Sequence, residues 1–130
     1  MSLAITRSVT QSTTTAGTFQ ALSALGAATV SSSFTVPTNV SSVKNITVSF
    51  SVDAVEGFCG LVKLTGNAMR DGDAVYGCGG QTAMPSSVGA NMMYVSIDTD
   101  LKVQPGNSIS YEICTTSAAT IDCVVTCQFA

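Results

Sequence analysis

The chain has 130 residues, of which only 10% are charged, and its net charge is −3. Its five Lys and Arg residues are scattered along the chain. Direct nucleic-acid binding requires clustered cations, so we do not expect this function. A soluble domain usually carries about a quarter charged residues, whereas here Ser and Thr together number 34 and hydrophobic residues make up 45%. We therefore expect other protein to cover much of the outer surface.

The N-terminal segment is predicted to be an arm. Residues 3–10 alternate apolar and polar, and residues 11–18 are a polar, low-complexity link. We divide the chain into an arm and link over 1–18 and one sandwich domain over 19–130, with the arm packing on a neighbouring subunit. The alternating positions expected at that interface are Leu3, Ile5, Arg7 and Val9. No run approaches the ~18 apolar residues of a membrane span. The polar start resembles no signal peptide, so we expect a chain that is made in the cytoplasm or is already a mature form.

The rest of the chain reads mostly as short strands. Residues 44–53 alternate with period two, which is typical of a half-buried strand. Pro, Gly and Asn turn signals recur between such runs. Short helical pieces are expected only at 19–26 and 66–70. The further predicted strands are 28–37, 92–98, 109–114 and 121–129. The pattern predicts an all-β protein, a two-sheet, jelly-roll-like β-sandwich with an extended N-terminal arm; a Greek-key sandwich of another order also fits.

The clearest strands predict the core and one pairing. A terminal hairpin is expected to pair Ile113 with Ile121 and Tyr111 with Cys123, because that register turns both apolar faces inward. The predicted core residues are Ile46, Val48, Phe50, Val52, Ile109, Tyr111, Ile113, Ile121, Cys123, Val125 and Phe129.

The five cysteines predict no metal site. Cys123 and Cys127 lie about 13 Å apart on an extended strand, at ~3.3 Å per residue, so they cannot share a disulfide or a metal and are interpreted as small buried hydrophobes. Cys59 and Cys78 are flanked by glycine on strands expected to be neighbours. A disulfide between Cys59 and Cys78 is therefore a possible cross-link, although an unexported protein normally keeps its thiols reduced.

Catalytic chemistry has few residues to draw on. The chain contains no His, the most common acid–base residue, and no Ser-x-x-Lys arrangement is present. The acidic pairs 71/73 and 98/100 coincide with a turn signal and a strand end, so a turn is the better interpretation than a cation site. We expect no enzyme activity, no cofactor and no metal.

The order of these features resembles a known group of proteins. A polar arm precedes a Pro-Thr-Asn-Val turn, the strand KNITVSFSVD and glycine-punctuated short strands, and the chain ends in SISYEICTTSAATIDCVVTCQF. This pattern is similar to the small β-sandwich coat and decoration (cement) proteins of viral and phage capsids. The resemblance implies a structural role in a virion, with copies of itself and a major capsid protein as partners. It implies no catalytic residue, and the single Arg within residues 1–43 favours a subunit that does not touch the genome.

Two other classes of function remain open from the sequence. A surface filament could use residues 3–10 as a donor strand that completes a neighbour's sheet. A small carbohydrate-binding sandwich is the other alternative, although the chain has no Trp and only three Tyr residues to stack on a sugar.

Overall fold

The computed structural model describes residues 3–11, 17–22, 32–53, 58–81, 91–115 and 120–130, and its regular elements there are all strands. The strands are β1 (Leu3–Gln11), β2 (Gln20–Ala21), β3 (Ser33–Thr35), β4 (Ser42–Asp53), β5 (Phe58–Thr65), β6 (Ala74–Gln81), β7 (Asn91–Lys102), β8 (Ser108–Thr115) and β9 (Thr120–Phe129). The all-β prediction is confirmed. The expected helical pieces are not found where they are described: Gln20–Ala21 is a strand, and residues 66–70 form a turn.

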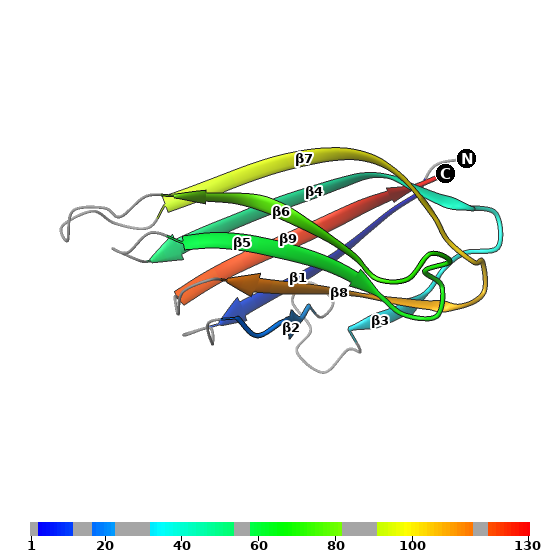
Figure 1. The fold of residues 1–130 in the computed structure, drawn as a ribbon, viewed down its shortest axis with the longest axis horizontal. Coiled ribbons are helices and arrows are strands. Elements are labelled where there is room, and N and C mark those ends of the chain that lie inside the picture. Colours follow the sequence, from blue (N-terminus) through cyan, green and yellow to red (C-terminus); the bar gives the residue numbers. More distant parts are fainter. Residues whose placement is uncertain (1–2, 12–16, 23–31, 54–57, 82–90, 116–119) are drawn as a thin grey trace.

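Two antiparallel sheets face each other in jelly-roll order (Figure 1). One has the order β1-β9-β4-β7, and the other has the order β2-β8-β5-β6, with β3 also paired to β8. The first half of the chain pairs with the second half in reverse: β1 with β9, β2 and β3 with β8, β4 with β7, and β5 with β6. A long hairpin folded over on itself in this way is a jelly roll, so the predicted β-sandwich is confirmed.

The N-terminal segment lies in the chain's own sandwich. β1 pairs with β9 along its whole length, from Leu3 opposite Phe129 to Gln11 opposite Ile121. This corrects the expectation of an arm that extends away from the domain. The physical reason is that β1 gives β9 its second hydrogen-bonding neighbour, and Ile5 packs against the core from this position.

The predicted terminal hairpin is wrong. β8 belongs to the sheet of β5, and β9 to the sheet of β1 and β4. Ile113 pairs with Gln20 and Val62, and Ile121 pairs with Gln11 and Val52. Alternation turns both apolar faces inward whether the strands lie side by side or face each other across the core, so the pattern did not distinguish the two arrangements.

The core lies between the sheets and is built from the alternating positions. Tyr111 and Phe129 are among its largest buried side chains, each with 0% exposure. The side chains of Phe50 and Val52 lie outside the described residues, so their burial stays a prediction. The predicted core residues that are confirmed as buried are Ile46, Val48, Ile109, Tyr111, Ile113, Ile121, Cys123, Val125 and Phe129.

The turn after β5 depends on a glycine. Gly66 has φ +133, and a Cβ built there would lie 2.5 Å from the carbonyl oxygen of Ser108. Gly66 therefore allows the turn to press against the start of β8, where the amide of Ala68 donates to the same Ser108 oxygen at 2.9 Å. The oxygen of Asn67 accepts from the Ser108 amide at 2.8 Å and ties the two segments further.

Candidate functional site

The residues predicted to form an assembly interface lie on β1, but two of them face their own chain. Ile5 packs against the core, and Arg7 lies over the Phe34 ring at 5.0 Å from its centroid. Leu3 is 37% exposed at the start of the strand. Val9 pairs with Cys123, and its side chain lies outside the described residues. The part of this set open to a partner therefore centres on Leu3.

Arg7 belongs to a contact network that holds β1 against the opposite sheet. Phe34, on β3, makes edge-to-face contacts with Tyr111 at 5.2 Å and with Phe129 at 6.0 Å between ring centroids. The Tyr111 hydroxyl donates to the carbonyl oxygen of Ile5 at 3.2 Å. An inward-pointing charge is one of the devices that keep an edge strand from pairing with another molecule, and Arg7 fits that description.

The middle of the outer face of the β1-β9-β4-β7 sheet is polar through hydroxyl groups, and the charged side chains of this face lie towards its ends. Thr6, Thr126, Thr47 and Ser96 occupy one row across all four strands. The Thr6 and Thr126 hydroxyls lie 2.9 Å apart. Next to this row, the Asn45 amide donates to Ser96 Oγ at 2.9 Å. Such a face stays hydrated without charge repulsion between neighbouring molecules.

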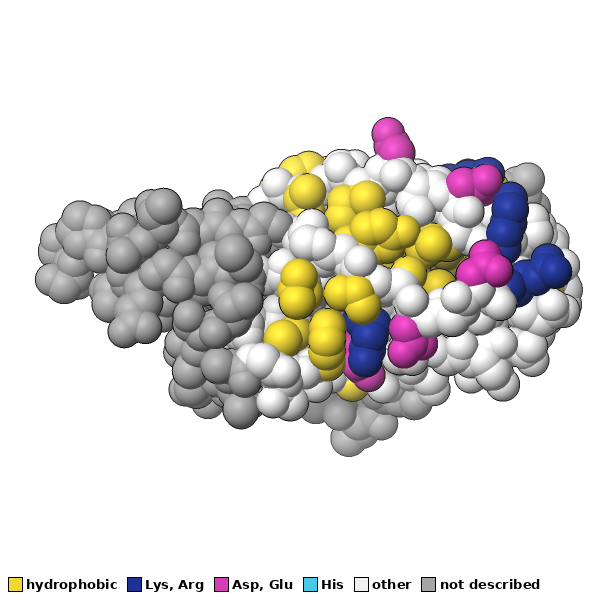
Figure 2. Space-filling view, viewed as in Figure 1, with side chains coloured by type: hydrophobic (Ala, Val, Ile, Leu, Met, Phe, Trp, Pro, Cys, Tyr) yellow, Lys and Arg dark blue, Asp and Glu magenta, His cyan; other side chains and the backbone are white. Residues whose placement is uncertain are grey.

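The flank where β6 and β7 run side by side is different, because apolar side chains gather along it (Figure 2). Val75 on β6 is 50% exposed and Tyr94 on β7 is 70% exposed. These are two of the three exposed large hydrophobic residues among those described, the third being Leu3. Val95 and Ile97 also lie here, partly buried against the core.

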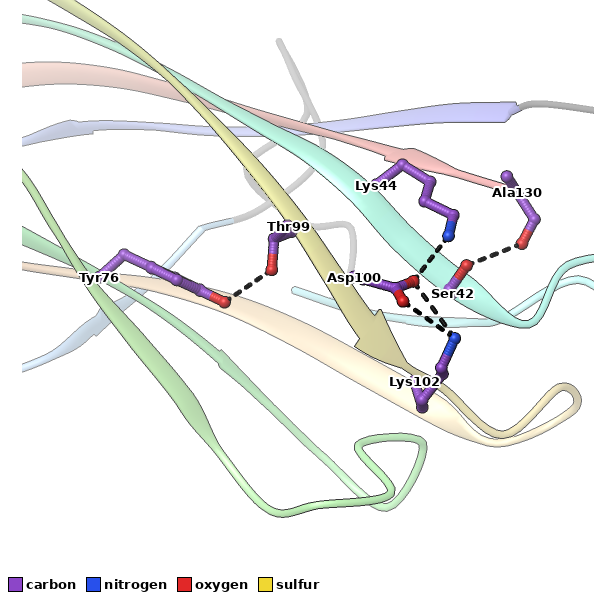
Figure 3. Close-up of polar contacts among 7 residues, drawn as sticks. All are labelled: Ser42, Lys44, Tyr76, Thr99, Asp100, Lys102 and Ala130. Atoms are coloured by element: carbon purple, nitrogen blue, oxygen red, sulfur yellow. Dashed lines mark hydrogen bonds and ion pairs between the residues drawn. The ribbon is translucent and has the colours of Figure 1, made fainter.

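One hydrogen bond joins the two sheets across this flank. The Tyr76 hydroxyl and Thr99 Oγ1 lie 2.9 Å apart, linking β6 to β7 (Figure 3). In the described part of the chain, β7 is paired only with β4 and β6 only with β5. The flank therefore presents two neighbouring sheet edges with apolar side chains between them.

Charged groups of both signs gather at the end of this flank (Figures 2 and 3). Asp100 accepts from Lys44 at 2.6 Å and from Lys102 at 3.2 Å. The hydrogen bond from Lys44, and then that from Lys102, lowers the pKa of the Asp100 carboxyl. All three side chains are about half exposed, so the network contributes little to stability. It does neutralise the strand end.

The two strands that carry the predicted cysteine cross-link pair with each other, but their register does not place Cys59 directly opposite Cys78. Cys59 lies on β5 and Cys78 on β6, and these strands pair, with Cys59 opposite Gly80 and Leu61 opposite Gly77. Cys78 is buried. The side chain of Cys59 lies outside the described residues, so the disulfide stays a prediction.

Cys123 and Cys127 are buried in the core, as the sequence indicated. Burial raises the pKa of each thiol from 9.0 to about 12. Because the thiolate is the nucleophile and metal ligand, these side chains act as small hydrophobes at neutral pH. Within the described residues, no three His, Cys, Asp or Glu side chains form a group that could hold a metal ion.

The acidic pairs of the sequence have structural partners. Asp73 accepts from the Thr65 hydroxyl at 2.7 Å, and Asp98 accepts from the Asn45 amide at 2.9 Å. Among the described residues, no helix is both long and apolar enough to cross a membrane.

The exposed side chains that the sequence analysis missed are Tyr94 and Val75. In residues 92–98 either alternating set could have faced the core, so only the structure identifies Tyr94 as the outward residue.

No protein-family model matches this sequence, and no curated protein matches it. Its fold is similar to solved structures of a viral coat protein. A mutant VP2 protein of infectious bursal disease virus in T=1 particles aligns with a TM-score of 0.55 and 12% identity, covering 98% of this chain and 31% of that chain. The VP2 subviral particle aligns with a TM-score of 0.53 and 11% identity, covering 98% of this chain and 32% of that chain. The structure of the virus of the Gx strain aligns with a TM-score of 0.51 and 15% identity, covering 98% of this chain and 31% of that chain.

These similarities establish the fold. Almost the whole of this chain aligns, but it spans only about a third of the length of the chains it matches. The protein is thus a jelly roll of the kind found as one part of a larger viral coat protein.

Proposed function

We propose that this chain is a structural subunit of a viral or phage capsid. The observation that carries the proposal is the alignment of 98% of the chain, as one jelly roll, with VP2 in viral particles. The sequence adds independent support, because a chain with 10% charged residues lacks the repulsion that keeps soluble monomers apart. The localisation that follows from this role is the virion.

The subunit acts through surfaces rather than through chemistry. Its partners are copies of itself and a major capsid protein, and it makes no direct contact with nucleic acid. We propose a small coat subunit or a decoration protein. The exposed Leu3 end of β1 and the β6–β7 flank are the surfaces best suited to such contacts, because they carry the exposed large hydrophobic residues of the described chain.

Assembly of the purified chain tests this function. Sedimentation velocity and electron microscopy would be run on the chain alone, and again after mixing with purified shells from its native source. A coat subunit forms shells or their oligomeric precursors unaided, whereas a decoration protein binds to existing shells. A chain that stays monomeric and does not sediment with shells would refute both forms of the proposal.

A further inference from the structure

The edge of β7 is the best candidate for a specific contact between subunits. We propose that two copies of this chain pair through β7, antiparallel and edge to edge, about a twofold axis at Ser96. The two four-stranded sheets then become one continuous sheet. This inference rests on the proposed assembly role and names its contact.

β7 is the least protected long edge of the described sandwich. It runs for 12 residues without a Pro. Its charged side chains, Asp98, Asp100 and Lys102, lie on the outer face towards its C-terminal end, and those of Val95, Ile97 and Thr99 on its inner face are uncharged. Exposed strands of this type are templates for pairing with another chain unless a charge, a Pro or a bulge protects them. β1, at the other edge of the same sheet, is protected by the inward Arg7 and the bond from Tyr111.

The alternation along β7 is complementary to itself. An antiparallel pair centred on Ser96 places Val95 opposite Ile97 of the second copy, so that two partly buried apolar side chains from each molecule meet. On the outer face it places Tyr94 opposite Asp98 of the second copy, where a phenol hydroxyl can donate to a carboxylate. No two like charges are opposed in this register.

Other registers fit less well. A centre at Asp98 would oppose two carboxylates, which is destabilising. A centre at Ile97 would place Tyr94 opposite Asp100, whose carboxylate already accepts from two lysines of its own chain. A centre between two residues would put inner positions opposite outer ones. A centre at Ser96 places Tyr94 opposite Asp98, which accepts from Asn45 through one carboxylate oxygen and keeps acceptor capacity for a second donor.

The surroundings of β7 also suit a second copy. Tyr94 is 70% exposed and Val95 and Ile97 are only partly buried, so pairing along β7 would remove apolar surface from water. Asp100 is already neutralised by Lys44 and Lys102 at the end of the strand. The partner therefore meets an apolar strip with a rim of paired charges, which is the usual anatomy of a protein interface.

A charge-swap experiment tests the register. Ser96→Lys and Ser96→Glu would be compared with the wild-type chain by sedimentation velocity, with circular dichroism as the check of folding. Each variant alone places like charges opposite each other on the axis, and we expect self-association to weaken by about fivefold. An equal mixture of the two variants should restore association, because Lys then faces Glu. The matched control is Ala21→Lys, which adds the same charge to an exposed position on β2, at the edge of the other sheet farthest from β6.

Cysteine cross-linking gives a second, independent measurement. Opposed residues in an antiparallel pair have Cα atoms about 4.5–5.5 Å apart, within the range that a disulfide spans. Ser96→Cys should therefore form covalent dimers on mild oxidation, and Ala21→Cys should not.

Several results would overturn the inference. The inference is wrong if the wild-type chain and both Ser96 charge variants self-associate equally strongly in sedimentation velocity. It is also wrong if mixing the two variants does not restore association. Stronger effects at Ala21 than at Ser96 would contradict it. A wild-type chain that is monomeric alone but binds shells would also overturn it while leaving the proposed function intact. A chain that neither associates nor binds shells would refute the function itself.

Discussion

Alkaline pH is expected to destabilise this protein through two thiols in its core. Cys123 and Cys127 are buried on β9, and burial raises the pKa of each from 9.0 to about 12. In the unfolded chain the same thiols ionise near pH 9. Because the folded pKa is the higher one, the folded state is fully favoured below pH 9. That advantage is lost as the pH rises from 9 towards 12.

The size of the effect follows from the linkage between proton binding and folding. Each thiol lowers the free energy of unfolding by roughly 1.4 kcal/mol for every pH unit above 9, so the pair removes roughly 3 kcal/mol between pH 7 and pH 10. This is a large part of a typical domain stability of about 5–15 kcal/mol. Burial also raises the pKa of Tyr111, which adds a further loss above pH 10.

Urea denaturation followed by circular dichroism, in a reducing buffer at pH 7 and pH 10, measures this loss. Cys123→Ala and Cys127→Ala should each remove about half of the pH-dependent part, whatever they do to stability at pH 7. Val125→Ala is the control, because it alters the same buried strand without removing an ionisable group. Equal stability at the two pH values, or an undiminished loss in both cysteine variants, would show that these thiols do not set the alkaline limit.

Three further outcomes are expected from the structure. Gly66→Ala should destabilise the fold by more than the 1 kcal/mol or so expected for Gly72→Ala, because only at Gly66 would a Cβ meet a backbone atom at 2.5 Å; equal thermal midpoints would contradict this. Deleting residues 1–11 should cause unfolding or insolubility by exposing the edge of β9, and a soluble domain with native circular dichroism would show that β1 is dispensable. Moderate NaCl should leave the assembly state unchanged, because few charges are available to screen; dissociation by salt in sedimentation velocity would argue for a charged interface.

The sequence predicted the strands and the buried faces well because both depend on a local signal. Ile46 and Val48 are separated by one polar residue, and period-two alternation is sufficient to turn both inward. The same signal could not give the partner of each strand. Ile113 and Ile121 are both inside the sandwich, yet they lie in different sheets, because β8 and β9 are consecutive in the chain but lie on opposite sides of the core.

The candidate surfaces were harder to predict for a related reason. Exposure of Tyr94 depends on which alternating set of β7 faces the core, and apolar residues occupy both sets. The inward direction of Arg7 depends on Phe34, which is distant in sequence and offers its ring to the guanidinium. The sequence therefore identified an alternating N-terminal strand correctly, but it assigned its apolar face to another molecule rather than to the core of the same chain.

The few charged residues of this chain are unevenly distributed over its surface, and their distribution favours assembly through one side of the sandwich. Hydroxyl groups such as those of Thr6, Thr47 and Thr126 keep the outer face of one sheet hydrated without charge, while ion pairs gather near Asp100 at one end. Between them, the β6–β7 flank is the described region where two unpaired strand edges lie next to each other, with Tyr94 exposed on the outer face of β7. A chain that packs laterally through this flank would bury its least soluble surface and leave its hydroxyl face in water. Such a chain needs little net charge in order to remain soluble, provided that the flank is covered in the assembled particle.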